Sequence, residues 1–267
     1  MDETLMRRSP PVVAEYLNGM SPRQRAIEKQ TKVLDWIYNW GYSSAEIIRR
    51  VAGIEARGYA NKLVKAGLLL ATPTEGGGVI RDVPKHYYTL AGPGLDDASR
   101  RAQTQARYLE IDPYKVNQRL LRHNLLAQQL TCNVIESREV RTHVTERNLE
   151  LLFKGVAKRP DVVWVLDDGN AIGVEVELSP KWERDLDHFV FAVMESLNPE
   201  SQDGAPFASF IIVTDSPAIR TRYQAAVQPG TRLPVWRKDE RGRWQTVHSI
   251  EVPDWLHERI EFLVIGR

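Results

Sequence analysis

The segment 159–181 most constrains the fold of this chain, because it combines two strand patterns with a short turn. Residues 161–166 are rich in Val and Trp, and in residues 171–178 apolar side chains alternate with Gly and Glu. Both patterns are typical of β-strands. The four residues between them, Asp-Asp-Gly-Asn, suit a tight turn. The sequence therefore predicts an antiparallel hairpin that brings Asp161 beside Glu175.

Acidic side chains gather on this predicted hairpin. Glu175 and Glu177 point to the same strand face, because side chains alternate with a period of two. Hard cations prefer carboxylate oxygens together with phosphate and water. Asp161, Glu175 and Glu177 are therefore candidate ligands of Mg²⁺ or Mn²⁺, and without a cation at least one of their pKa values should be raised. The alternative is an ordinary solvated strand face, which shows the same alternation.

The motif resembles a known family. Pro160-Asp161, followed after thirteen residues by Glu175-Val176-Glu177, is similar to the core of the PD-(D/E)XK phosphodiesterases. The resemblance implies that Asp161, Glu175, Glu177 and Lys181 are catalytic and that the three carboxylates hold the metal. Glu177 departs from the usual lysine. Some members carry Glu there, and others move the lysine to the following helix, where Lys181 stands.

The surrounding elements agree with this resemblance. The sequence predicts helices over 114–131, 182–197 and 218–227, and strands over 140–145, 161–166, 171–178, 207–214 and 233–237. Along the chain, the helix at 114–131, three strands, the helix at 182–197 and the strand at 207–214 follow the order α-β-β-β-α-β. This is the order of elements in the nuclease core. It predicts an α/β sandwich in which helices cover the faces of one mixed sheet.

The first part of the chain predicts three helices. Helix start and stop signals place them from Ser21 to Gly41, from a capping box of Ser43 and Glu46 to Gly53, and over about 54–66. Two strands follow, at 68–71 and 86–90, joined by a glycine-rich turn. This order resembles a winged helix-turn-helix domain. The fold expected for the whole chain is α+β, with a winged helix domain at residues 1–104 and a nuclease-like domain at residues 105–267.

The winged-helix resemblance implies contacts with double-stranded DNA. In that family the third helix enters the major groove and the wing touches the backbone. The candidate DNA-binding residues are Arg49, Arg50, Arg57, Asn61, Lys62, Lys65, Arg81 and Lys85. The alternative is that these side chains only solvate an exposed surface, or that the domain binds another protein.

Composition sets the compartment expected for the protein. The 267 residues carry a formal net charge of +1, so charge alone does not identify a nucleic-acid-binding protein. Cys132 is the single cysteine, which is typical of a reducing cytosol. The sequence shows neither a secretory signal nor a run of about 20 apolar residues that would cross a bilayer. A cytoplasmic protein without membrane insertion is expected.

The two resemblances together narrow the predicted function. A winged helix joined to a metal-dependent nuclease core resembles the mobilisation relaxases with a restriction-enzyme fold and the related replication-relaxation proteins. This implies nicking at the transfer origin of a plasmid or integrative element, with a coupling protein and accessory DNA-binding proteins as partners. One alternative is a DNA-binding regulatory protein whose core has lost activity, which the Glu177 departure favours. Another is a restriction enzyme that cuts both strands.

Several histidines near the predicted core have two interpretations. His123 lies in a leucine-rich helix and is typical of a packed histidine, although helices at this position sometimes lend a polar residue to the cleft. His143 and Glu146 flank the first strand, and Glu146 is a possible extra ligand. His188 follows Lys181 on the next predicted helix, where it can face a phosphate.

Aromatic residues in the last third of the chain also have a structural interpretation. Tyr223 lies in a predicted helix and is expected to pack against the core, not to attack a phosphate. Trp236 and Trp244 bracket a basic turn, which predicts a hairpin with a charged tip. A contact between this turn and a DNA backbone is the alternative.

Overall fold

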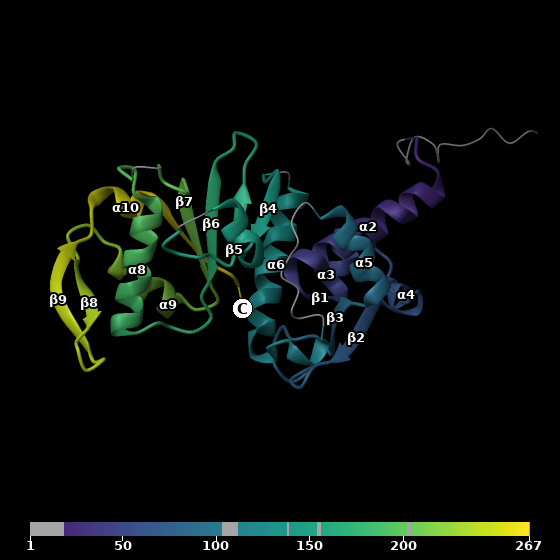
Figure 1. Cartoon of the computed structure of the whole chain (residues 1–267), viewed down its shortest axis with the longest axis horizontal. Coiled ribbons are helices and arrows are strands. Elements are labelled where there is room, and N and C mark those ends of the chain that lie inside the picture. Colours follow the sequence, from purple (N-terminus) through teal and green to yellow (C-terminus); the bar gives the residue numbers. More distant parts are fainter. Residues whose placement is uncertain (1–18, 103–111, 138, 154–155, 202–203, 267) are drawn as a thin grey trace, which may run out of the picture. The chain divides into compact units, whose positions relative to one another are not determined.

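The computed structural model describes residues 19–102, 112–137, 139–153, 156–201 and 204–266 (Figure 1). These residues form two compact units. The first takes its described residues from Met1–Thr74 and Pro84–Lys115, and the second from Glu75–Val83 and Val116–Arg267. The predicted boundary between residues 104 and 105 lies outside the described residues.

The first unit consists of helices and a small antiparallel sheet. Its strands pair in the order β1-β3-β2. Buried residues of α2, α3, α4 and the sheet, among them Leu34, Ile48, Leu63 and Leu90, form its core. The elements are α2 (Pro22–Trp40), β1 (Ser43–Ser44), α3 (Ala45–Val51), α4 (Tyr59–Lys65), β2 (Leu69–Pro73), β3 (His86–Leu90), α5 (Gly92–Arg101) and the 3-10 turn η1 (Pro113–Lys115).

The first predicted helix is confirmed, including its cap. The Ser21 hydroxyl accepts a hydrogen bond from the Gln24 backbone amide, and the Gln24 side chain accepts one from the Ser21 amide. This reciprocal capping box fixes the start of α2. Gly41 ends the helix with a φ of 89°, a conformation that glycine adopts without steric cost.

The second predicted helix starts one residue later than expected. Ser44 is the N-cap of α3, and its hydroxyl accepts a hydrogen bond from the Ile47 amide at 3.2 Å. The predicted capping box of Ser43 and Glu46 is therefore wrong. Ser43 is buried in β1 opposite Tyr88, and Glu46 binds Arg49 instead. Strand pairing thus decides which of two adjacent serines caps the helix.

The third predicted helix is shorter than expected, because its first residues take another structure. Gly58 is the N-cap with a φ of 91°, and α4 begins at Tyr59. The Arg49 guanidinium donates hydrogen bonds to the carbonyls of Ile54 and Glu55, at 3.2 Å and 3.4 Å. These bonds hold the preceding segment outside the helix.

The second unit contains a five-stranded mixed sheet with the order β10-β7-β6-β5-β4. β4, β5 and β6 pair antiparallel, whereas β6, β7 and β10 pair parallel. The strands are β4 (Thr142–Thr145), β5 (Val162–Val165), β6 (Ala171–Val176), β7 (Ser209–Thr214) and β10 (Ile260–Val264). The helices are α6 (Leu121–Glu136), α7 (Leu149–Leu152), α8 (Glu183–Leu197), α9 (Pro217–Ala226) and α10 (Asp254–Glu258), with the 3-10 turns η2 (Gln118–Leu120) and η3 (Glu146–Asn148).

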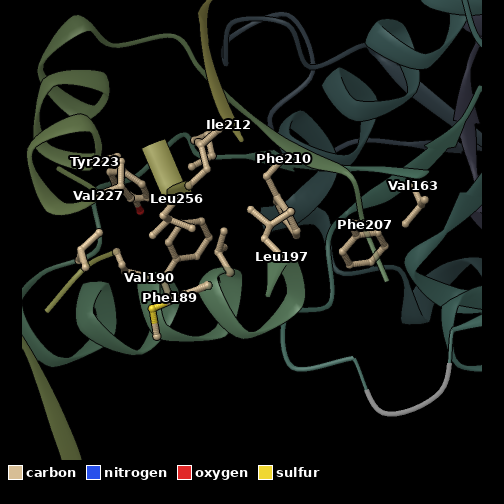
Figure 2. Close-up of a cluster of buried hydrophobic side chains, with 14 of the residues drawn as sticks. Val163, Phe189, Val190, Leu197, Phe207, Phe210, Ile212, Tyr223, Val227 and Leu256 are labelled. Carbon is tan, nitrogen blue, oxygen red and sulfur yellow. The ribbon is translucent and has the colours of Figure 1, made fainter. Parts of the chain in front are cut away.

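Helices pack against both faces of this sheet. On one face, the Trp164 indole of β5 donates a hydrogen bond to the Thr131 hydroxyl of α6 at 3.1 Å. On the other face, Phe189 and Val190 of α8 lie with Phe210 and Ile212 of β7 in one buried cluster (Figure 2). Because both faces are covered, the sheet strands read as nearly continuous apolar runs.

The C-terminal third differs from the prediction in its strand partners. The strand expected over 233–237 is β8 (Arg232–Lys238), but it pairs with β9 (Trp244–Glu251) in a separate two-stranded sheet beside α8 (Figure 1). The predicted charged-tip hairpin is therefore confirmed. The fifth strand of the main sheet is β10, which the sequence pattern does not indicate.

The helix predicted over 114–131 also differs at its start. The Asn117 side chain accepts a hydrogen bond from the Arg119 amide and caps the 3-10 turn η2, so α6 begins only at Leu121. Among the described residues, no helix has the length and apolar content needed to span a bilayer.

Gly173 is the one position of β6 where a side chain has no room. A Cβ atom built there would lie 2.6 Å from the Phe210 ring of β7. The absence of a side chain lets Phe210 pack against the strand that carries Glu175. Glycine at this position thus lets the Phe210 ring pack between β6 and the buried side chains of α8.

We expect Gly173→Ala to lower the free energy of unfolding by about 1–3 kcal/mol, because overpacking forces Phe210 to move. Urea denaturation monitored by tryptophan fluorescence measures this change. Gly266→Ala is the matched control, since a Cβ at Gly266 meets no atom within 4 Å. Equal stability of the two variants would contradict the packing argument.

Candidate functional site

The predicted hairpin brings the first two acidic residues together. Val162 pairs with Val174 in the antiparallel register of β5 and β6, so Asp161 lies opposite Glu175. The Asp161 Oδ2 atom accepts a hydrogen bond from the Val176 amide at 2.7 Å. This bond fixes the Asp161 carboxylate against the end of β6. The prediction that Asp161 and Glu175 are neighbours is confirmed.

The strand face that carries the glutamates is not solvated. Glu175 is 6% exposed and Glu177 is 5% exposed. Val174 and Val176 point to the opposite face and are also buried. Burying a carboxylate is costly unless hydrogen bonds or opposite charges compensate it. The interpretation as an ordinary solvated strand face is therefore wrong.

Lys158 compensates the charge of Glu175. Its Nζ atom lies 2.7 Å from Glu175 Oε1 and also donates a hydrogen bond to the Arg159 carbonyl at 2.7 Å. Lys158 is not among the site residues predicted from the sequence. The only feature of the sequence that points to Lys158 is its position three residues before Asp161. This position does not show that the Lys158 side chain contacts Glu175 of β6.

Glu175 retains one unsatisfied oxygen. Within the described part of the chain, the buried Oε2 atom has no hydrogen-bond partner. Burial, and then the negative charge of Asp161, raises the pKa of Glu175 to about 7, although Lys158 and Lys181 oppose the shift. The predicted pKa increase is confirmed for this residue. An acceptor oxygen without a donor, beside a second carboxylate, fits a bound divalent cation.

Glu177 pairs with Lys181. The Lys181 ammonium forms an ion pair with Glu177 Oε1, and it lies 3.9 Å from Glu175 Oε1. Burial lowers the pKa of Lys181, assisted by the charge of Lys158. The sequence predicts a helix that starts at Trp182, but α8 begins at Glu183. Lys181 therefore lies in the segment just before α8.

His123 of α6 also contacts the site. Its Nε2 atom lies 2.8 Å from the Val176 carbonyl oxygen and 3.2 Å from Asp161 Oδ2, and its Nδ1 atom lies 2.9 Å from Asn124 Oδ1. Burial acts to lower the His123 pKa, but the hydrogen bond and charge of Asp161 outweigh it and raise the pKa to about 9. The imidazolium therefore faces the Asp161 carboxylate at neutral pH.

His123, Glu175, Glu177 and Lys181 border a cavity of about 430 Å³ in the second unit. The loop 75–83 contributes Ile80 and Val83 to its wall. Within this unit Arg122 binds Asp215 at 2.5 Å and lies 3.5 Å from Asp82 of the same loop. The other lining residues are Gln118, Arg119, Leu120, Arg122, His123, Glu175, Val176, Glu177, Leu178, Ser179 and Lys181.

The carboxylates do not converge as a set of three. In the described ranges, no group of three His, Cys, Asp or Glu side chains is placed to hold one metal ion. Asp161 and Glu175 alone are adjacent. One or two carboxylates are sufficient for Mg²⁺ when phosphate and water supply the remaining ligands. The pair therefore fits one cation, with Lys158, Lys181 and His123 providing positive charge around it.

The other histidines and Tyr223 lie outside this cluster. His143 pairs with Trp164 across the sheet, and burial lowers its pKa to about 4. Glu146 starts η3 and its backbone amide donates to the Asp161 carbonyl, at 3.2 Å. His188 packs 5.1 Å from the Trp244 ring. Tyr223 is fully buried, which confirms its packing role, and its hydroxyl accepts a hydrogen bond from the Lys181 amide.

The candidate DNA-binding residues differ in their exposure and in their hydrogen-bond and ion-pair partners. Lys62 and Lys65 are exposed on α4, and Arg57 is exposed in the turn before it. Asn61 accepts a hydrogen bond from the Tyr88 hydroxyl at 3.3 Å.

The other candidate DNA-binding residues lie outside α4. Arg49 binds Glu46 and two backbone carbonyls, and Arg50 is half-buried on α3. Lys85 is exposed before β3, whereas Arg81 lies in the loop 75–83 of the second unit beside Asp82.

Comparisons with protein-family models, with curated proteins and with solved structures find no match to this chain.

The pKa of Glu175 predicts a pH-dependent stability. Because the folded protein holds this proton up to about pH 7, instead of 4.5, unfolding should become easier as pH rises from about 4.5 to 7. The raised pKa of His123 adds a second loss between about 6.5 and 9. Urea denaturation across this range in EDTA should show that Glu175→Gln removes the first loss. Asp167→Asn, an exposed change in the same hairpin, should leave it unchanged; an unaltered profile for Glu175→Gln would refute the assignment.

Proposed function

We propose that this protein is a Mg²⁺- or Mn²⁺-dependent DNA phosphodiesterase of the PD-(D/E)XK type. The observation that supports this best is the buried Glu175 opposite the half-buried Asp161, with Lys158 and Lys181 beside Glu175. Glu175 and Lys181 border a cavity. Buried acids and lysines with shifted pKa values are typical of functional sites. The mixed sheet with helices on both faces is also compatible with this family.

The chemistry assigns different tasks to the side chains. Asp161 and Glu175 would hold the cation, which when bound polarises the scissile phosphate and lowers the pKa of a water ligand. Lys158 and Lys181 stabilise negative charge that develops on the phosphate. His123 keeps Asp161 oriented by facing its Oδ2 atom at 3.2 Å. The two lysines would thus stabilise charge on the same phosphate group that the bound cation would polarise.

Glu177 explains how the site tolerates its departure from the family motif. The lysine usually found at this position is replaced by a pair, in which Glu177 on the strand extension holds Lys181 in front of α8. The positive charge is therefore supplied from four residues further along the chain. In this proposal Glu177 is a positioning residue and not a metal ligand.

The first unit is proposed to bind double-stranded DNA as a winged helix-turn-helix domain. Its helices α2, α3 and α4, followed by the antiparallel strands β2 and β3 of a sheet with the order β1-β3-β2, support this proposal. Lys62 and Lys65 on α4, with Arg57 just before it, are the favoured contacts because they are exposed. Arg49 has a structural role instead, because its guanidinium binds Glu46 and backbone carbonyls.

The more specific proposal is a mobilisation relaxase that nicks a transfer origin of a plasmid or integrative element. It rests on the combination of a DNA-binding domain with a nuclease core. A coupling protein and accessory DNA-binding proteins are its proposed partners. A restriction enzyme of the same fold would instead cut both strands of relaxed DNA.

A second candidate function is a DNA-binding regulator with an inactive core. The observation that favours it is the charge balance of the site, where Lys158 binds Glu175 and Lys181 binds Glu177. Such ion pairs stabilise the carboxylates without any cation. An inactive core would therefore remain folded and would not need Mg²⁺.

Supercoiled plasmid that carries the native neighbouring DNA distinguishes the two. We expect open circles with Mg²⁺ or Mn²⁺ but not with EDTA, measured on agarose gels. Glu175→Gln and Asp161→Asn should each slow nicking by about 10²-fold or more, since a charged ligand acts directly in the reaction. Asp167→Asn, with the same change of charge on the same hairpin, should nick like the wild type.

Three results would contradict this prediction. Undiminished nicking by Glu175→Gln would show that another site, or a contaminant, cuts the plasmid. An unchanged plasmid topology together with intact DNA binding would favour the regulator. Linear products from relaxed DNA, without preference for the origin, would identify a restriction enzyme instead.

DNA binding by the first unit is tested separately. We expect the Lys62→Ala, Lys65→Ala double variant to bind duplex DNA more weakly in fluorescence anisotropy. The slope of log K against log salt should fall by about 0.9 for each lost phosphate contact. Lys32→Ala is the control, because Lys32 on α2 already pairs with Glu28 at 2.6 Å. An unchanged salt slope in the double variant would exclude α4 from the interface.

A further inference from the structure

An exposed tryptophan adjoins the candidate site at the start of α8. Trp182 is 59% exposed, although the Arg222 guanidinium lies 3.1 Å from its ring centroid. Trp182 follows Lys181, which borders the cavity. An exposed aromatic ring with a cation on one face therefore belongs to the residue that follows a cavity-lining lysine.

A second exposed tryptophan lies on the β8–β9 hairpin of the same unit. Trp244 is 41% exposed, with the Arg184 guanidinium 4.9 Å and the Lys238 ammonium 5.2 Å from its ring centroid. Arg184 is two residues from Trp182 along the chain. Both rings thus lie near the first turn of α8, and we call Trp182, Arg184, Arg222, Lys238 and Trp244 the tryptophan–cation surface.

The charges of this surface favour an anionic partner. Arg184 also contacts Asp185, at 3.0 Å. In the part of the chain that the structure describes, no acidic side chain lies within ion-pair distance of Arg222 or Lys238. Residues 232–251 carry five Lys and Arg against three Asp and Glu. Arg222 and Lys238 thus place positive charge beside the aromatic rings.

Planar rings beside cations match one class of polyanion. In unpaired nucleic acid the base faces are free to stack on aromatic side chains, while phosphates bind lysine and arginine. In a duplex the base faces are covered by neighbouring base pairs, so exposed tryptophans would gain no stacking partner. The surface therefore favours a single strand over a duplex.

We infer that the tryptophan–cation surface binds an unpaired DNA strand beside the nuclease site. The inference rests on the proposed function for the identity of the polymer as DNA. It adds that the site handles a strand separated from its complement, so the substrate class is locally melted DNA, not intact duplex. Trp182 and Trp244 stack bases, and Arg222 and Lys238 contact phosphates.

The test uses fluorescein-labelled dT20 and the whole chain in EDTA, so that no cleavage is needed. We expect Trp182→Ala, Trp244→Ala to weaken dT20 binding at least about tenfold in anisotropy titrations. Trp182→Phe, Trp244→Phe should retain most of the affinity, because the phenyl rings still stack. Tyr114→Ala, which removes a ring that is 88% exposed elsewhere, should bind dT20 like the wild type.

The outcomes separate this inference from the proposed nuclease. Wild-type affinity for dT20 in the double alanine variant would overturn the surface, whether or not the protein nicks plasmid. Equal loss in the phenylalanine variant would also overturn it, because stacking would not then explain the effect. Loss confined to the alanine variant, in a protein that does not nick, would support the surface while refuting the nuclease.

Discussion

The hydrogen bond from the Val176 amide to the Asp161 carboxylate is the interaction on which the site depends. It fixes one acid at the end of β5 against the strand that carries Glu175. The Val176 carbonyl contacts His123, so the backbone of this one residue orients both an acid and a histidine from different elements. Without that register, Glu175 would be a buried carboxylate beside lysines, with no second acid to share a cation.

The burial of these acids has an electrostatic consequence. Removing a carboxylate from water costs more than most single interactions return, so such groups persist only with compensating partners. Lys158, Lys181 and His123 supply that compensation from three separate segments. Because Glu175 Oε2 still has no donor among the described residues, the compensation is incomplete at one atom. Under the proposed function, this incompletely compensated oxygen is where the cation would bind.

Sequence patterns predict those parts of the site that are local. The juxtaposition of Asp161 and Glu175 follows from one short hairpin, so alternation and turn residues are sufficient to place it. Lys158 and His123 could not be placed this way, since tertiary packing alone orients their side chains; His123 reaches Val176 across 53 positions. The same reason explains the capping by Ser44 in place of Ser43, where a distant strand decides. The strand β10 was missed because a five-residue segment without turn signals carries little periodic information.

The loop 75–83 has a consequence for how the chain can be divided. It connects β2 to β3 of the first unit in sequence, yet Ile80 and Val83 belong to the wall of the cavity in the second. The second unit is therefore discontinuous, and no single cut yields it whole. A C-terminal fragment beginning at residue 116 would keep every acid and lysine of the site but would lose part of the cavity wall. Recombination that exchanged only the N-terminal segment would likewise replace residues that border the candidate site, so the first unit and part of the cavity wall would be exchanged together.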